Sequence, residues 1–116
     1  MDVKRGDVWL VSLDPTIGHE IKKSRPAVII QNDLGNKFSP ITIIAPVTSQ
    51  NIENVYPFEV FLSSKRTGLE KDSKVLLNQI RAVDKRRLVK RLGRLDDEAL
   101  ERVDESIRIS LGLEKL

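Results

Sequence analysis

The first 83 residues contain short apolar segments with the spacing of β-strands. Residues 7–13 and 57–62 alternate roughly between apolar and polar side chains, as strands with one buried face do. Residues 26–32 and 41–49 are almost continuous runs rich in β-branched residues, which is typical of strands buried on both faces. Residues 74–83 form another apolar segment, interrupted by two amide side chains, and we predict a strand there too.

The last twenty residues follow a helical period instead. Apolar side chains at three- and four-residue spacing line one face of a helix over residues 97–111; they are Leu100, Val103, Ile107 and Leu111. Asp96 is a suitable N-cap for this helix, and Gly112 supplies a stop.

These elements favour one small, mainly β domain that spans residues 1–116. A chain of this length can form one packed core but not two. The strands are short and closely spaced, and Gly35, Asn36 and Pro40 mark a turn between the second and third, which suggests a strongly bent sheet or small barrel. We therefore predict an α+β fold, mainly β, in which a small antiparallel barrel is followed by a C-terminal helix.

Composition excludes several classes of function. The chain has no cysteine and one histidine, His19, so disulfide frameworks, thiolate chemistry and multi-histidine metal sites are ruled out, and we expect no metal or cofactor. The opening residues lack the apolar core of a signal peptide and no apolar run is long enough to span a membrane, so we expect a cytoplasmic protein. The net charge of +3 permits a nucleic-acid partner without requiring one.

Two polar side chains are predicted to meet where the second and third strands adjoin. Pro26 disfavours a helical conformation at Arg25 and so holds this residue extended at the start of its strand. Thr48 lies at the end of the next strand, and a short connection favours antiparallel pairing, which brings the start of one strand beside the end of the other. Arginine stays charged and presents a planar fork to phosphate oxygens, so this pair suggests a phosphodiester site. The alternative is a solvated surface arginine beside an ordinary strand threonine.

The surrounding polar residues offer further candidates. The loop of residues 16–24 carries His19 and Glu20 as possible acid–base groups and Lys22 and Lys23 as phosphate contacts, although most such loop residues are simply solvated. Only five aromatic residues occur, spread along the chain, so the sequence indicates no cluster of exposed rings on which RNA bases stack. Base recognition would then fall to polar side chains near the strand ends: Asn32, Ser49, Gln50 and Gln79.

Residues 81–94 form the most basic segment, with seven Lys or Arg and one Asp. This segment has two equally good interpretations. Either its cations bind along the phosphates of an RNA backbone, or their positive charge compensates the negative charge of the acid-rich stretch that comes directly after it.

Four segments together resemble the MazF/PemK family of toxin endoribonucleases in order and spacing: VKRGDVWLVSLDPTIGHE, RPAVIIQNDLGNKFSP, PVTSQ and KDSKVLLNQIRAVDKRRL. The resemblance continues through the C-terminal helix. It implies a small SH3-like β-barrel, a homodimer with an RNA groove near the subunit interface, cleavage of single-stranded RNA at short sequences, and inhibition by a cognate antitoxin in the same groove.

By this resemblance, the family's catalytic arginine and threonine fall on Arg25 and Thr48, and an acidic loop residue that some members need falls on Glu20. Many relatives have a glycine shortly before the Arg–Pro pair, where this chain has Lys22, Lys23 and Ser24. Asn78 also stands where an acidic residue is frequent, a difference that bears on which RNA sequence is preferred.

The resulting hypothesis is metal-independent transesterification, in which the RNA's own 2′-hydroxyl attacks the phosphate. Two alternatives remain at this point. One is a toxin like CcdB, which has the same barrel and binds gyrase without cutting nucleic acid. The other is a non-catalytic RNA-binding barrel that uses residues 81–94.

Overall fold

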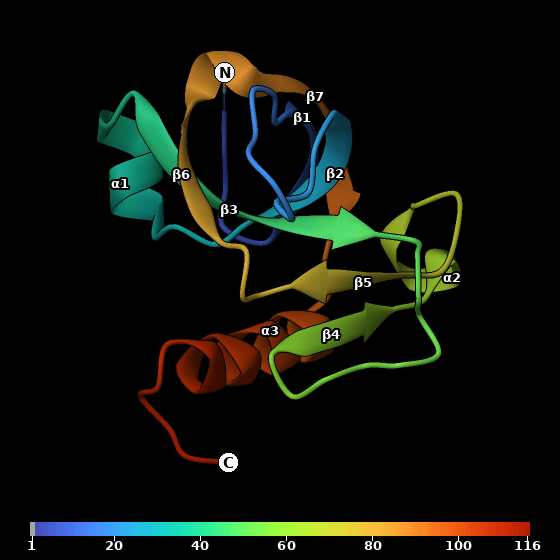
Figure 1. Ribbon diagram of the computed structural model, residues 1–116. Coiled ribbons are helices and arrows are strands. Elements are labelled where there is room, and N and C mark those ends of the chain that lie inside the picture. Colours follow the sequence, from blue (N-terminus) through green and yellow to red (C-terminus); the bar gives the residue numbers. More distant parts are fainter. Residues whose placement is uncertain (1) are drawn as a thin grey trace.

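Seven strands form one bent antiparallel sheet in the computed structural model, which describes residues 2–116 (Figure 1). The strands are β1 Asp7–Ser12, β2 Ser24–Ile29, β3 Ile41–Thr48, β4 Glu59–Leu62, β5 Ser73–Leu76, β6 Arg81–Asp84 and β7 Leu88–Arg94. The helical segments are α1 Asp33–Phe38, α2 Ser64–Thr67, the 3₁₀ turn η1 Lys85–Arg87, and α3 Asp97–Ser110.

The sheet runs in the order β4-β5-β3-β2-β1-β7, and β6 also pairs with β3. Strand β3 is therefore the centre: its first half pairs with β6 and its last two residues pair with β5. Within residues 2–116 no pairing joins β4 to β7, so the sheet is barrel-like without being closed. This confirms the prediction of a mainly β, bent antiparallel fold with a C-terminal helix.

Two strand predictions were wrong. Residues 74–83 are not one strand, because residues 77–80 turn between β5 and β6 and the Gln79 N–H donates to the Leu76 carbonyl at 3.2 Å. Strand β7 was missed within the basic segment, although its backbone pairs with β1 along most of its length. Three of its four exposed positions carry charged side chains and the fourth is Val89, so apolar and polar residues do not alternate as they do in a half-buried strand.

The predicted turn after β2 contains a short helix, α1. Asn32 caps it by accepting a hydrogen bond from the Gly35 N–H at 2.8 Å, and Asn36 is buried with its side chain bonded to Gln31 and Thr42. Six residues are too few for a hydrophobic period to reveal a helix, so glycine and asparagine led to a turn prediction instead.

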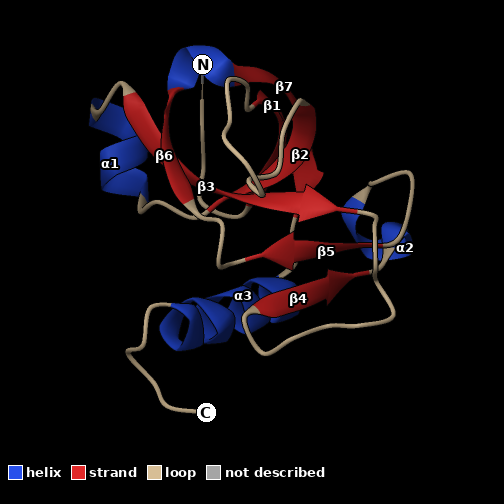
Figure 2. Ribbon diagram, in the orientation of Figure 1, coloured by secondary structure: helices blue, strands red, loops and turns tan. Residues whose placement is uncertain are grey.

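Apolar residues fill two clusters, one on each face of the central strands. One cluster includes Val8, Val28 and Ala45 and is covered by α3; the other includes Trp9, Ala27 and Ile44. Figure 2 shows the helices outside the sheet, with α3 along β4 and β5. No helix within residues 2–116 has the length and apolar character needed to cross a membrane.

Helix α3 confirms the C-terminal prediction at both ends. Asp96 accepts the N-cap hydrogen bond from the Ala99 N–H at 2.8 Å, and Gly112 follows the helix with a φ of 74°. Val103 is fully buried as predicted, whereas Leu111 is 54% exposed because it lies beyond the last turn that faces the sheet.

Candidate active site

The register of β2 and β3 brings Arg25 and Thr48 to the same end of the sheet. The paired residues are Ala27 with Pro46, Val28 with Ala45 and Ile29 with Ile44. Counted two positions further, this register matches Arg25 with Thr48, although the ladder itself ends before them. Each side chain makes its hydrogen bond within its own loop: Arg25 Nε donates to the Lys22 carbonyl at 2.8 Å, and Thr48 Oγ1 accepts from the Gln50 N–H at 3.1 Å.

The two strands separate at this end of the sheet. Strand β2 stays paired with β1 as far as Ser24, and β3 pairs with β5 at Val47 and Thr48. The ladder between β2 and β3 ends at the pair of Ala27 and Pro46. The next hydrogen bond of that ladder would come from residue 26, and Pro26 has no N–H to donate. The separation leaves Arg25 half-buried at the rim rather than enclosed in the sheet.

Arg25 borders an open hollow of about 400 Å³, whose lining also includes Val47, Ser49 and Lys90. Residues 25, 27 and 29 share a face of β2, and residues 44, 46 and 48 share the matching face of β3. A second open hollow, of about 360 Å³, adjoins Pro46, and its lining includes His19, Glu20, Asn78, Gln79 and Arg81 but neither Arg25 nor Thr48. Thr48 is 8% exposed, so only a small part of it reaches solvent.

The loop of residues 13–23 is held at both ends. The Leu13 N–H donates to the Lys23 carbonyl and the Lys23 N–H donates to Asp14 Oδ1, both at 3.1 Å, which closes the base of the loop. The Ile21 N–H donates to Gln79 Oε1 at 2.8 Å and ties the loop to the turn of residues 77–80. Gln79 therefore holds the loop against this turn at the edge of the 360 Å³ hollow. Its side-chain nitrogen makes no hydrogen bond to residues 2–116 and is available to a ligand.

Glu20 and His19 are exposed on this loop. One carboxylate oxygen of Glu20 accepts a hydrogen bond from the Ile17 N–H at 2.5 Å, so the side chain folds back over its own turn. The other oxygen is free to act on a ligand in the hollow. His19 borders the same hollow without a protein hydrogen bond among the described contacts.

One of the residues that stand in place of the family's glycine before Arg25 adopts an unusual backbone conformation. Lys23 has a φ of 70°, in the left-handed region that glycine adopts readily and other residues adopt at a cost. The chain therefore makes the turn that a glycine would make, with a cation in that position. Lys22 and Lys23 are both exposed beside Arg25.

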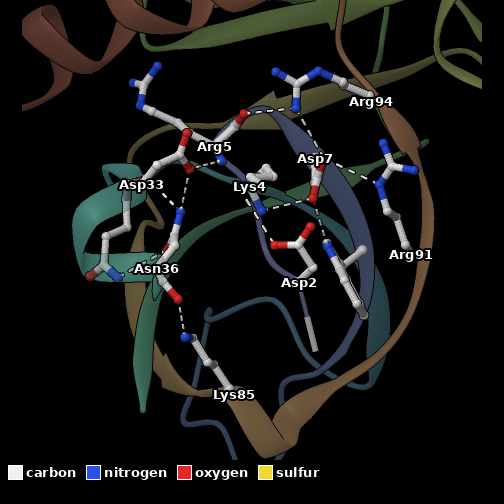
Figure 3. A network of polar contacts seen from close by, with 11 residues as sticks. Asp2, Lys4, Arg5, Asp7, Asp33, Asn36, Lys85, Arg91 and Arg94 are labelled. Atoms are coloured by element: carbon white, nitrogen blue, oxygen red, sulfur yellow. Dashed lines mark hydrogen bonds and ion pairs between the residues drawn. The ribbon is translucent and has the colours of Figure 1, made fainter. Parts of the chain in front are cut away.

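Most cations of residues 81–94 bind other parts of the protein (Figure 3). Arg91 and Arg94 contact the buried Asp7 carboxylate at 3.3 and 3.2 Å, and Lys85 donates to the Asn36 carbonyl. Arg87 donates to the carbonyls of Ser12 and Asp14, at the start of the loop that carries His19. This segment therefore holds the N-terminal strand and the loop in place, and its charge is not mainly directed at the acidic helix that follows.

The predicted RNA-binding residues divide into two groups. Ser49 and Gln50 follow Thr48 directly and are exposed, and Gln79 borders the hollow. Asn32 lies beyond the other end of β2, away from Arg25, where its side chain caps α1. The structure does not bring Asn32 to the hollow.

Sequence reasoning missed Arg81 as a site residue. It pairs with Ile44 in the ladder of β3 and β6, so it faces the side on which Pro46 and Thr48 lie, and it borders the hollow while one nitrogen donates to the Leu13 carbonyl at 3.1 Å. In the sequence, residues 81–94 form one basic segment, in which Arg81 does not stand out. Strand alternation from Ile80 onward was the signal that could have separated Arg81 from its neighbours.

No group of three or more His, Asp or Glu side chains within residues 2–116 is arranged to hold a metal ion. The polar side chains that line the 360 Å³ hollow are one guanidinium, two amides, one imidazole and one carboxylate. This set is suited to binding a phosphodiester and moving protons beside it.

Comparison with known proteins gives matches over nearly the whole chain. Endoribonuclease EndoA of Bacillus subtilis (strain 168) is 48% identical over 113 residues, which are 97% of each protein. The crystal structure of MazF from Deinococcus radiodurans superposes with a TM-score of 0.82 at 27% identity, covering 97% of this chain and 98% of that one. A MazE–MazF complex from the same organism contains a chain that matches with a TM-score of 0.77 at 26% identity, covering 97% and 98%.

These matches support the MazF/PemK prediction over a CcdB-like toxin and over a non-catalytic RNA-binding barrel. The sequence profile of one family matches residues 4–111, from the first turn to the last residues of the C-terminal helix. The chain belongs to the PemK-like, MazF-like toxins of type II toxin–antitoxin systems.

Proposed function

We propose that this protein is a sequence-specific endoribonuclease that cleaves single-stranded RNA and uses Arg25 and Thr48 to bind the phosphate at the cut. The observation that carries the proposal is the β2–β3 register: counted two positions beyond its last pair, Ala27 with Pro46, it matches Arg25 with Thr48, and Arg25 borders an open hollow. The family and the 48% identity to an endoribonuclease support the same activity.

In the proposed reaction, the 2′-hydroxyl of the nucleotide before the cut attacks the adjacent phosphorus. The bond between phosphorus and the 5′-oxygen breaks, which leaves a 2′,3′-cyclic phosphate and a free 5′-hydroxyl. The 2′-proton passes to a general base, and the leaving 5′-oxygen gains a proton. The RNA supplies its own nucleophile, so no step requires a metal ion.

Arg25 stabilises the charge that builds up on the pentacovalent phosphorus, and it is placed to hand a proton to the leaving oxygen. Its Nε is bonded to the Lys22 carbonyl, which fixes the guanidinium and leaves both Nη groups for phosphate oxygens. Thr48 donates its hydroxyl hydrogen to a non-bridging oxygen while its oxygen still accepts from Gln50. The free oxygen of Glu20 and the imidazole of His19 are the two candidates for the general base.

The remaining charges and amides bind the RNA around the cut. Lys22 and Lys23 lie on the loop beside Arg25 and attract the backbone, with a contribution that weakens as salt rises. Ser49, Gln50 and Gln79 are placed to hydrogen-bond base edges. Asn32 contributes only if the RNA extends to the far end of β2.

We also place the protein in the cytoplasm as a homodimer that is silenced by a cognate antitoxin. The Deinococcus radiodurans relatives include MazE–MazF complexes at 26% identity, which supports a protein antitoxin as partner.

The test is incubation of the pure protein with a long RNA, followed by mapping of the cut positions and of the end groups. We expect cyclic phosphate and 5′-hydroxyl ends, full activity in EDTA, and loss of cleavage when the nucleotide before the cut is 2′-deoxy. Arg25→Ala and Thr48→Ala should each lower the rate by about 100-fold or more.

Arg86→Ala is the matched control, because Arg86 is exposed and binds only Asp84. It should cleave at the rate of the unmodified protein. If Arg25→Ala also cleaves at that rate, or if the products carry 5′-phosphates, the proposed assignment is wrong.

A further inference from the structure

An exposed aromatic side chain lies beside the proposed site, on the loop between β3 and β4. Tyr56 is 52% exposed, and its ring is stacked on that of Phe58 with 5.6 Å between centroids and an angle of 6° between planes. This pair was not predicted, because Phe58 was assigned to an alternating strand over residues 57–62 and Tyr56 lies before it, on the other side of Pro57. The prediction that no exposed rings cluster was wrong at this point.

The backbone around Tyr56 is fixed from several sides. Its N–H donates to Glu59 Oε1 at 3.1 Å and its carbonyl accepts from the Glu59 N–H at 2.8 Å. The next carbonyl, of Pro57, accepts from Ser106 Oγ of α3 at 3.0 Å. A half-exposed ring on a backbone held in this way loses little freedom when it binds a ligand.

A buried lysine connects this ring to Thr48. Lys74 is the cross-strand partner of Thr48, so the two side chains lie next to each other on the same face, with Cβ atoms about 5 Å apart. Lys74 Nζ lies 5.8 Å from the Tyr56 ring centroid and donates to Glu59 Oε1 and to the Asn54 carbonyl, both at 2.8 Å. Tyr56 therefore lies within reach of the same short nucleic-acid segment that would contact Thr48.

The loop between Thr48 and Tyr56 is rich in exposed amides. Gln50, Asn51 and Asn54 are all exposed, and Asn54 Nδ2 donates to Asn51 Oδ1 at 3.0 Å, which orders this part of the loop. These groups correspond to the parts of a nucleotide: the Tyr56 ring can stack on a base, the amides can hydrogen-bond its edge, and the Thr48 hydroxyl can contact a phosphate. A protein partner would instead be expected to use a larger continuous apolar surface.

We propose that Tyr56, supported by Phe58 and Lys74, is a stacking site for one unpaired RNA base near the cut. The inference rests on the proposed endoribonuclease function and adds a residue that sets which nucleotide is preferred. The stacked base is not the one at which the bond breaks, so Tyr56 contributes to substrate binding and not to the chemical step.

The test uses a short RNA that spans the strongest mapped cut site, with 2′-deoxyribose at the nucleotide before the cut so that it binds without being cleaved. Tyr56→Ala should raise the Kd by roughly 10- to 100-fold. Tyr56→Phe keeps the ring and should stay within about twofold of the unmodified protein. With cleavable RNA, Tyr56→Ala should raise KM and leave kcat nearly unchanged.

A series of abasic RNAs identifies the base concerned. At one position near the cut, removal of the base should weaken binding as much as Tyr56→Ala does, and the two changes together should cost no more than either alone. Tyr56→Leu, an apolar side chain without a ring, should behave like Tyr56→Ala while unfolding at the same temperature as Tyr56→Phe.

Several results would overturn the inference while leaving the proposed function intact. One is unchanged RNA binding by Tyr56→Ala. Another is that the losses of affinity from Tyr56→Ala and from removal of a base simply add at every position. A third is a lower kcat with unchanged KM. A change of molecular mass in solution on Tyr56→Ala would also overturn it, because the ring would then contact a second copy of the chain. Failure of the proposed function itself would appear differently, as intact RNA with the unmodified protein.

Discussion

The ion pair between Lys74 and Glu59 allows a quantitative test of how the proposed site is supported. The Lys74 and Glu59 side chains are 4% and 8% exposed, and Nζ and Oε1 are 2.8 Å apart. Lys74→Met removes the cation and keeps most of its volume, so a carboxylate remains in the interior without a counter-charge. We therefore expect this substitution to be strongly destabilising.

The expected size follows from the burial of both groups. Removal of one member of a buried ion pair costs about 3–5 kcal/mol, because the remaining charge has lost its hydration and gained no partner. The total free energy of unfolding of a small domain is about 5–15 kcal/mol. With a urea dependence of about 1.5 kcal/mol per molar, Lys74→Met should lower the urea midpoint by roughly 2–3 M.

The double variant Glu59→Leu/Lys74→Met separates charge from packing. It removes both charges, so its main loss is the acceptor for the Tyr56 N–H, and it should cost only about 1 kcal/mol. Arg108→Met is the control: it breaks the Arg108–Glu105 pair, in which both side chains are 47% exposed, and should leave the midpoint unchanged. The reasoning fails if Lys74→Met unfolds at the same urea concentration as the control, or if the double variant is less stable than Lys74→Met.

Two further substitutions test the loop and the N-terminal network. Lys23→Gly relieves a left-handed conformation and should raise the free energy of unfolding by about 0.5–1 kcal/mol, whereas Lys23→Ala keeps the strain; equal urea midpoints for the two would refute this. The backbone hydrogen bond from the Arg5 N–H at 2.7 Å lowers the pKa of Asp33 below its usual 3.8, so its contribution is present above pH 3.8 and is lost as the pH falls through the lowered value. Asp33→Asn keeps an acceptor without the charge and should cost about 0.5–1 kcal/mol at pH 7, with a smaller difference from the unmodified protein at pH 3; a difference that does not shrink on acidification would contradict this.

The elements predicted correctly from the sequence are those in which buried apolar and exposed polar residues follow the pattern of a strand or helix. Strands β1 and β3 and helix α3 were found close to their predicted bounds because their apolar residues recur with the period of the element. The placement of Arg25 and Thr48 at the same end of the sheet followed from antiparallel pairing alone. Where periodicity is absent the predictions failed: α1 is too short, and β7 is covered by charges on its exposed side.

Contacts between distant segments were beyond sequence reasoning. The buried Asp7 attracts Arg91 and Arg94 across the sheet, and Arg5 pairs with Asp104 of α3 at 2.6 Å. Neither contact could be predicted from the neighbouring sequence, because the charge and spacing of residues do not show which distant segment a long side chain will reach. The roles of Arg81 and Tyr56 were missed for the same reason: each becomes apparent only when its strand or loop is placed beside Thr48.

The separation of β2 and β3 at the proposed site has a physical basis in one proline, Pro26. Strand β2 continues its pairing with β1 to Ser24 and β3 continues with β5 to Thr48, while their own ladder ends at Pro46. A continuous ladder would press the two strand ends together and pair their backbone groups with each other. Because Pro26 lacks the required N–H group, the strands diverge while each remains anchored by its outer neighbour. In the proposed function, this divergence leaves Arg25 and Thr48 on strands that are each anchored by an outer neighbour, so that both can contact one phosphodiester.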